Sequence, residues 1–146
     1  MDRELKPINI LLIDDSEDDI LIIKRTFKKL RTTNNINAVR GGEEALDYLR
    51  RRGRYAEEKP PTAGLILLDI SMPGMNGFEV LKELKADSDL KKIPVIMLTT
   101  SSHEEDIVRS YEGGACSYVT KPVGKDEFFK ALKRLSIYWT MVSSIP

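Results

Sequence analysis

The chain has 146 residues, with 23 Lys plus Arg against 23 Asp plus Glu, so its formal net charge is zero. This length suits one domain with an ordinary core. The charge balance argues against nucleic acid or an anionic membrane as the main partner. The single cysteine, Cys116, excludes an intrachain disulfide framework and favours a reducing, cytoplasmic compartment. No apolar run approaches the roughly 20 residues that span a bilayer.

Five short apolar segments predict β-strands. They occupy residues 8–14, 36–39, 64–69, 94–99 and 116–120. Three of them are almost continuously apolar, which is typical of strands covered by helices on both faces. Helical patterns alternate with these segments, as expected for βα units around a parallel sheet.

Apolar residues at helical spacing predict five helices between and after the strands. The first begins at Ser16, where Asp19 three residues later gives a start resembling a capping box. The longest gap, residues 53–63, holds two prolines and predicts a surface loop. The expected fold is α/β, an open doubly wound sheet of five parallel strands flanked by five helices. The residues that mark the helices are Ile20, Ile23, Phe27 and Leu30; Ala45, Leu46 and Leu49; Phe78, Leu81 and Leu84; Ile107, Val108 and Tyr111; and Phe128, Leu132, Leu135 and Trp139.

Polar residues collect where the predicted strands end. In a doubly wound sheet, ligands bind at the carboxyl ends of the strands. We therefore expect three carboxylates, hydroxyl groups and one ammonium group at a single edge of the sheet. The residues concerned are Asp14, Asp15, Asp69, Thr99, Thr100, Lys121 and Pro122.

Three clustered carboxylates repel one another, so they shift their pKa values or bind a cation. Three negative charges, Lys121 and a divalent ion sum to zero, and ligands that are all oxygen favour Mg²⁺ or Mn²⁺ over zinc. An aspartate can act as a nucleophile and form an aspartyl-phosphate. Asp69 at its strand tip would attack phosphorus, while the metal, Lys121 and Thr99 serve the phosphoryl oxygens.

Four segments together resemble the receiver domains of two-component response regulators, the CheY-like family. They are LLIDDS, LILLDISMPGMNG, IPVIMLTTS and SYVTKPV, and the resemblance covers about residues 8–139. It implies a flavodoxin-like sheet with strand order 2-1-3-4-5. It also implies one receiver domain over residues 1–146, with a short C-terminal tail at 140–146 and no output domain.

The resemblance implies a role for each site residue. Asp69 accepts a phosphoryl group from a phosphohistidine of a sensor histidine kinase. Mg²⁺, or Mn²⁺ in its place, is held by Asp15, Asp69 and the backbone carbonyl of Ser71, with Asp14 assisting indirectly. Lys121 contacts the phosphoryl group and precedes Pro122 through a cis peptide bond.

The resemblance also implies a switch. Thr99 is its hydroxyl, Tyr118 its aromatic residue, and Thr100 lines the site. The protein would signal by phosphorylation-dependent protein contacts. It would not be an enzyme beyond its own phosphotransfer and autodephosphorylation.

A narrower resemblance is to the stand-alone regulators paired with phytochrome-type kinases. It rests on the long loop before the third strand, the run TTSSHEED and the ending SIYWTMVSSIP. It implies a light- or PAS-sensing kinase as partner. It also implies a homodimer through the fourth helix, fifth strand, fifth helix and C-terminal tail. Lys121 and Pro122 are general to receivers and do not distinguish this subgroup.

Two other functions compete with this interpretation. One is a pseudo-receiver that binds partners without being phosphorylated. The other is a phosphatase of the haloacid-dehalogenase class, but that chemistry needs a general acid where this chain has Ser71.

Three further residues have structural interpretations. We expect His103 to be exposed near the start of the fourth helix and Cys116 to pack in the core. Trp139 either folds back onto the domain or forms a dimer or partner surface.

Overall fold

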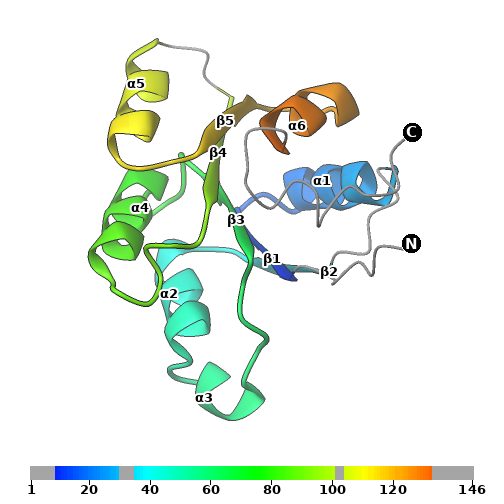
Figure 1. Ribbon diagram of the computed structural model, residues 1–146. Helices are drawn as coiled ribbons and strands as arrows, with labels where there is room; N and C mark the ends of the chain where they lie inside the picture. The colour runs from blue at the N-terminus through cyan, green and yellow to red at the C-terminus, as the bar shows by residue number, and fades with distance from the viewer. Residues whose placement is uncertain (1–8, 30–34, 101–103, 133–146) are drawn as a thin grey trace, which may run out of the picture.

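The computed structural model describes residues 9–29, 35–100 and 104–132, and these form a parallel sheet with helices on both sides (Figure 1). The strand order β2-β1-β3-β4-β5 confirms the fold implied by the sequence. Each strand ends at or next to the residue predicted for it. The strands are β1 (Asn9–Ile13), β2 (Asn35–Val39), β3 (Leu65–Asp69), β4 (Val95–Thr99) and β5 (Ser117–Thr120).

The helices are α1 (Glu17–Lys29), α2 (Gly42–Arg50), α3 (Tyr55–Glu58), α4 (Gly77–Ala86), α5 (Glu104–Glu112) and α6 (Lys125–Leu132). Five of them correspond to the predicted helices. The short α3 was not predicted, because residues 53–63 were interpreted as a loop. No helix among the described residues is long and apolar enough to cross a membrane.

A buried aromatic side chain explains α3. Tyr55 is 5% exposed, and its ring meets that of Tyr48 edge to face, with ring centroids 5.1 Å apart. The guanidinium carbon of Arg54 lies over the Tyr55 ring, 4.6 Å from its centroid. Burying an aromatic ring is strongly favourable, so this one turn of the loop is held against α2.

Alternating strand residues face two separate cores. Leu11 and Ile13 of β1 pack into a cluster beneath α2 and α4, whereas Ile10 and Leu12 pack beneath α1 and α6. Figure 1 shows α1 and α6 on one side of the sheet and α2, α4 and α5 on the other. Because β1, β3 and β4 are covered on both faces, their residues are almost all buried.

The register of the sheet aligns the carboxyl ends of the strands. Ile13 pairs with Leu68, and Thr99 pairs with Thr120. Backbone bonds continue past the strands, since Asp14 N–H donates to Val39 O at 3.1 Å and Lys121 N–H donates to Thr99 O at 2.7 Å. The residues that follow β1, β3, β4 and β5 therefore meet at one edge.

The prediction that Cys116 packs in the core is wrong, because its side chain is exposed. Cys116 directly precedes the edge strand β5, and its two neighbours, Ala115 and Ser117, take the buried positions. The Cys116 N–H still donates to Val95 O at 2.8 Å, so the residue is anchored by its backbone. His103, Trp139 and the tail at 140–146 lie outside the described residues.

Candidate functional site

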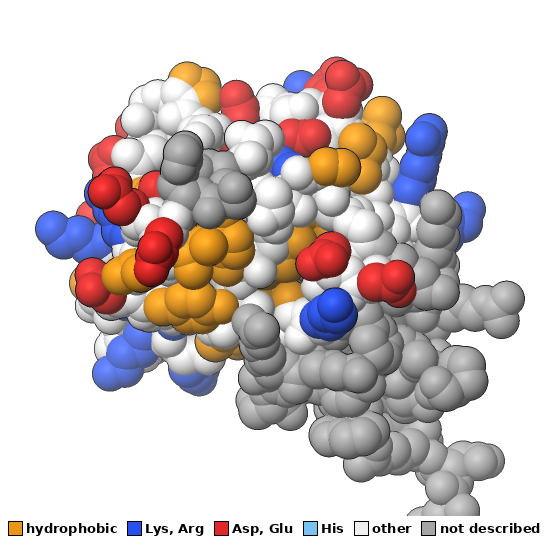
Figure 2. All heavy atoms as spheres, turned by 90° about the horizontal axis from the view of Figure 1, so that it is seen from above, with side chains coloured by type: hydrophobic (Ala, Val, Ile, Leu, Met, Phe, Trp, Pro, Cys, Tyr) orange, Lys and Arg blue, Asp and Glu red, His pale blue; other side chains and the backbone are white. Residues whose placement is uncertain are grey.

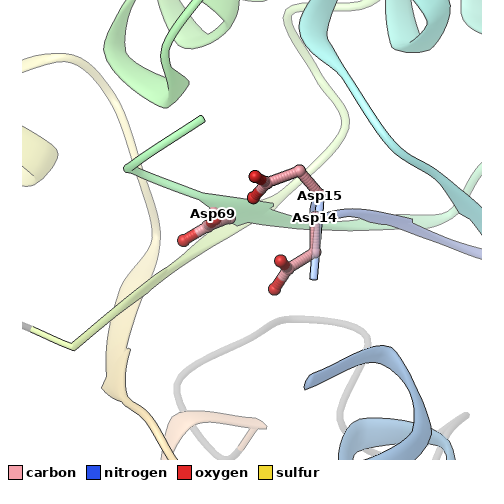
Figure 3. Close-up of side chains that lie close together, drawn as sticks. All are labelled: Asp14, Asp15 and Asp69. Carbon is pink, nitrogen blue, oxygen red and sulfur yellow. The ribbon is translucent and has the colours of Figure 1, made fainter. Parts of the chain in front are cut away.

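Three aspartates meet where β1 and β3 end. Asp14, Asp15 and Asp69 each offer a carboxylate oxygen, and these oxygens all lie within 4.8 Å of one another. Figure 3 shows Asp14 and Asp15 leaving the end of β1 in opposite directions, with Asp69 at the neighbouring end of β3. Asp14 and Asp69 are buried, with exposures of 0% and 4%, whereas Asp15 is exposed. The group is therefore open to solvent on one side only.

The start of α1 fixes the carboxylate of Asp14. The Ser16 N–H donates to Asp14 Oδ1 at 3.0 Å, and the Asp19 N–H donates to Ser16 Oγ at 3.3 Å. These bonds satisfy backbone donors that have no partner within the helix. The turn that begins the helix thus also orients a site carboxylate.

Lys121 lies among three carboxylates. Its Nζ is 2.7 Å from Asp14 Oδ2, 2.8 Å from Asp19 Oδ2 and 3.2 Å from Asp69 Oδ1. The Lys121 side chain is only 7% exposed. The Lys121–Pro122 peptide bond is cis, as the family resemblance implied.

These contacts shift the pKa values of two groups in ways that matter for chemistry. Burial raises the pKa of Asp69 to about 6, the charge of Asp14 adds to this rise, and Lys121 opposes it. Burial alone would lower the pKa of Lys121, but hydrogen bonds to Asp14 and Asp19 and the charge of Asp69 outweigh it and raise that pKa. Lys121 therefore stays protonated, and a cation near Asp69 would favour its charged form.

The loop after β3 leaves no room for a side chain at Gly77. A Cβ at Gly77 would lie 2.3 Å from the carbonyl oxygen of Asp69 and 2.8 Å from Ile70 Cα. The helix that follows, α4, begins with a capping box. The Asn76 side chain accepts a hydrogen bond from the Glu79 backbone N–H, and the Glu79 side chain accepts one from the Asn76 backbone N–H. The backbone of Asp69 is therefore fixed by close packing on its carboxyl side.

Ser71 lies in the same loop and is exposed. It borders an open cavity of about 520 Å³ that Phe78 and Arg109 also line. The Arg109 guanidinium carbon lies 4.1 Å from the Phe78 ring centroid, so a cation–π contact joins α5 to α4 beside this loop.

The hydroxyl residues occupy two neighbouring strands. Thr99 ends β4 and is buried, and Thr100 follows it at the exposed edge. Tyr118 is half-buried, lies opposite Met97 in the register and packs against the core cluster beneath α2 and α4. Tyr118 thus lies two register positions before the ends of β4 and β5, on the same face as that cluster.

The surroundings of the site are acidic. Each of the helices α1, α2, α4, α5 and α6 carries carboxylates in its first turn. Helix N-termini favour negative charge, and in this fold they lie at the same edge as the strand ends. In the view from above (Figure 2), acidic side chains are spread over this face and most basic ones lie at its margin.

Asp19 is the site residue that sequence reasoning did not identify. Its position three residues after Ser16 explained it as a helix-start residue. A second signal was present: Asp19, Ile23 and Thr26 follow helical spacing, and Ile23 and Thr26 are buried. Asp19 therefore lies on the inward side of α1, where its carboxylate reaches Lys121.

Residues 10–133 match the family model of the response regulator receiver domain. The chain belongs to this family. It is 35% identical to the response regulator Rcp1 of Synechocystis sp. over 99% of this chain and 97% of that protein. The family places this receiver in two-component signalling, where members are typically regulators and not enzymes.

Solved structures of relatives agree with the receiver fold. The bacteriophytochrome response regulator AtBRR superposes with a TM-score of 0.83 at 39% identity, over 92% of this chain and 96% of that one. The Mn²⁺-bound form of Rcp1 superposes with a TM-score of 0.76 at 35% identity, over 96% and 98%. The oxygen ligands of Asp14, Asp15 and Asp69 fit a divalent ion of this kind.

Proposed function

We propose that this receiver is a phosphorylation switch in which Asp69 accepts a phosphoryl group from a histidine kinase. The observation that carries the proposal is the placement of Lys121 Nζ, 3.2 Å from Asp69 Oδ1 and 2.7 Å from Asp14 Oδ2, beside three carboxylates that can hold a metal. A nucleophilic carboxylate, a fixed cation and a metal-binding group are the parts that phosphoryl transfer to aspartate requires.

The transfer is a displacement at phosphorus. A carboxylate oxygen of Asp69 forms the new P–O bond as the P–N bond to the kinase histidine breaks, and the histidine nitrogen retains the electron pair and takes up a proton. Lys121 donates to a phosphoryl oxygen and neutralises the charge that develops on it. The rigid end of β3 holds Asp69 in position for in-line attack.

A divalent cation, Mg²⁺ or Mn²⁺, would neutralise the acidic group and draw phosphoryl oxygens toward Asp69. Asp15 and Asp69 would be its side-chain ligands and Ser71 would offer its backbone carbonyl, with Asp14 assisting indirectly. The mutual proximity of the three carboxylates supports this assignment.

Residues of β4 and β5 would form the conformational switch that responds to phosphorylation of Asp69. Thr99, at the end of β4, would donate its hydroxyl to the phosphoryl group, with Thr100 and Pro122 lining the site. Tyr118 would move inward as Thr99 moves. Its half-buried position beside the core cluster beneath α2 and α4 supports this role.

Intact mass tests the chemistry. The wild type and Asp69→Asn are incubated with acetyl phosphate or phosphoramidate, with and without Mg²⁺. We expect one added phosphoryl group in the wild type with Mg²⁺ only, and none in Asp69→Asn. A folded wild type that gains no phosphoryl group under any condition would contradict the proposal and favour a phosphorylation-independent interaction module.

The kinase partner is proposed from the relatives. AtBRR is named as a bacteriophytochrome response regulator, and this chain is similar to it over 92% of its length. We propose a phytochrome-like or PAS-containing histidine kinase as donor. Transfer from a phosphorylated kinase of this class should exceed transfer from an unrelated histidine kinase at equal concentration, and equal rates would contradict this assignment.

A second copy of the chain is the proposed partner for the face formed by α5, β5 and α6. On α5, Val108 is 46% exposed and Tyr111 is 41% exposed, so an apolar surface is available there. Sedimentation velocity should show a dimer that Val108→Glu weakens. Leu21→Glu, at an exposed apolar position on α1, is the matched control and should leave the dimer unchanged.

A further inference from the structure

The first turn of α1 carries three carboxylates with different surroundings. Glu17 forms an ion pair with Arg40, and Asp18 is exposed. Asp19 instead turns inward, and its Oδ2 lies 2.8 Å from Lys121 Nζ across 102 positions of sequence. A general preference of helix N-termini for acids accounts for the presence of all three residues. It does not account for the contact that Asp19 alone makes.

The ammonium group of Lys121 has three protons and three carboxylate partners. They are Asp14, Asp19 and Asp69, on β1's end, on α1 and on β3's end. Lysine has a flexible stem of four carbons, so contact with a single carboxylate would leave its head free to rotate. Partners in three directions fix both the place and the rotation of the ammonium group.

Asp19 differs from the other two partners of Lys121 because it is not one of the carboxylates that can hold a metal ion. Asp14 and Asp69 belong to the three carboxylates that can hold a cation, and Asp19 does not. A cation at that group would compete with Lys121 for the oxygens of Asp14 and Asp69. The contact with Asp19 would remain.

We propose that Asp19 is a positioning residue that holds the Lys121 ammonium group so that one of its N–H bonds points at Asp69. The inference rests on the proposed role of Lys121 in phosphoryl transfer. Asp19 touches neither the acceptor carboxylate nor the phosphoryl group and acts through Lys121. Its backbone N–H is bonded to Ser16 Oγ, and its side chain is 29% exposed, so the residue is anchored at the rim of the site.

The test separates the acceptor oxygen of Asp19 from its charge. Asp19→Asn keeps an acceptor oxygen and loses the charge, whereas Asp19→Ala loses both. Asp18→Ala, one residue earlier and exposed, is the matched control. Three quantities are measured. One is the ¹⁵N order parameter of the Lys121 ammonium group without metal, and the other two are the maximal rate and the half-saturating concentration for phosphorylation by acetyl phosphate with Mg²⁺.

We expect Asp19→Ala to lower the order parameter and to reduce the maximal rate about threefold to tenfold, because orientation is lost. Asp19→Asn should retain most of both values, and Asp18→Ala should match the wild type. If Asp19→Ala does not fold, Asp19→Leu repeats the test with the branched shape of the side chain kept and no acceptor.

Two results would overturn the inference. One is an unchanged order parameter in Asp19→Ala. The other is an equal change of rate in Asp19→Asn and Asp19→Ala, which would show that Asp19 acts by charge alone. A wild-type protein that accepts no phosphoryl group would contradict the proposed function. The order parameter would then still report whether Asp19 holds Lys121.

Discussion

The N–H of Gly77 donates a hydrogen bond to the carbonyl oxygen of Ile70 at 2.9 Å, and this bond closes the loop that follows the acceptor strand. The closure brings the Cα of Gly77 against the backbone of Asp69, where a Cβ would lie 2.3 Å from the carbonyl oxygen. The first residue of α4 and the site carboxylate therefore share one rigid unit. The position requires glycine because of this close approach.

Gly77→Ala should lower the free energy of unfolding by about 2 to 3 kcal/mol, because backbone atoms must move to admit the methyl group. It should also slow phosphorylation of Asp69, since the same backbone atoms carry the acceptor. Gly41→Ala is the matched control, because a Cβ at Gly41 meets nothing within 4 Å. Urea unfolding of the two variants measures the difference, and equal stabilities would contradict the explanation.

The raised pKa of Asp69 predicts a pH dependence of stability. Its pKa is about 6 in the folded protein, above its ordinary value of 3.8. Between these values the folded protein binds the proton more tightly than the unfolded chain, so this contribution to stability is lost as pH rises through 6. Without metal, a charged Asp69 at neutral pH therefore destabilises the fold.

Asp69→Asn should then raise the free energy of unfolding by about 1 to 3 kcal/mol at pH 7.5 in EDTA, and by much less at pH 4. Urea titrations at the two pH values give the comparison. Asp89→Asn, at an exposed position, is the control and should shift stability equally at both. An effect of Asp69→Asn that does not vary with pH would contradict the assigned pKa.

Metal binding should stabilise the folded chain. At Mg²⁺ concentrations one hundred times the dissociation constant, we expect a gain of about 3 kcal/mol in unfolding free energy. Asp15→Asn should remove most of this gain while changing the metal-free stability little, because Asp15 is exposed. Asp18→Asn should keep the gain. A full gain in Asp15→Asn would exclude Asp15 as a ligand.

The fold was predictable because uninterrupted runs of apolar residues indicate buried strands. Each of β1, β3 and β4 holds four consecutive apolar residues, and the polar residue after that run, Asp14, Asp69 or Thr99, marks where the strand ends. Parallel strands put their carboxyl ends at one edge, so the meeting of Asp14 with Asp69 and Lys121 follows from topology.

The features that sequence missed depend on tertiary contacts. Asp19 had a sufficient local explanation at the helix start, so nothing in the sequence required its contact with Lys121. The turn of α3 forms because Tyr55 is buried against Tyr48, which local propensity does not indicate. Cys116 is apolar but is exposed at the start of the edge strand β5. For Asp19 and Tyr55, a contact with a side chain of another element decided the outcome.

Thr26 links α1 to the segment that follows Lys121 and gives a last prediction. Its buried hydroxyl lies 2.9 Å from Val123 O and 3.0 Å from Ile22 O, so its proton is shared between them. Thr26→Val keeps the shape of the side chain but leaves Val123 O without this donor. We expect a loss of about 1 to 3 kcal/mol in the free energy of unfolding. Thr26→Ser keeps the hydroxyl and should lose less.

Because Val123 is two residues after Lys121, Thr26→Val should also disturb the lysine. The ¹⁵N order parameter of the Lys121 ammonium group should fall in Thr26→Val and stay near the wild-type value in Thr26→Ser. A loss of stability with an unchanged lysine signal would show that Thr26 only joins α1 to this segment. A fall in both would show that α1 positions Lys121 twice, once through the carboxylate of Asp19 and once through the backbone that Thr26 holds.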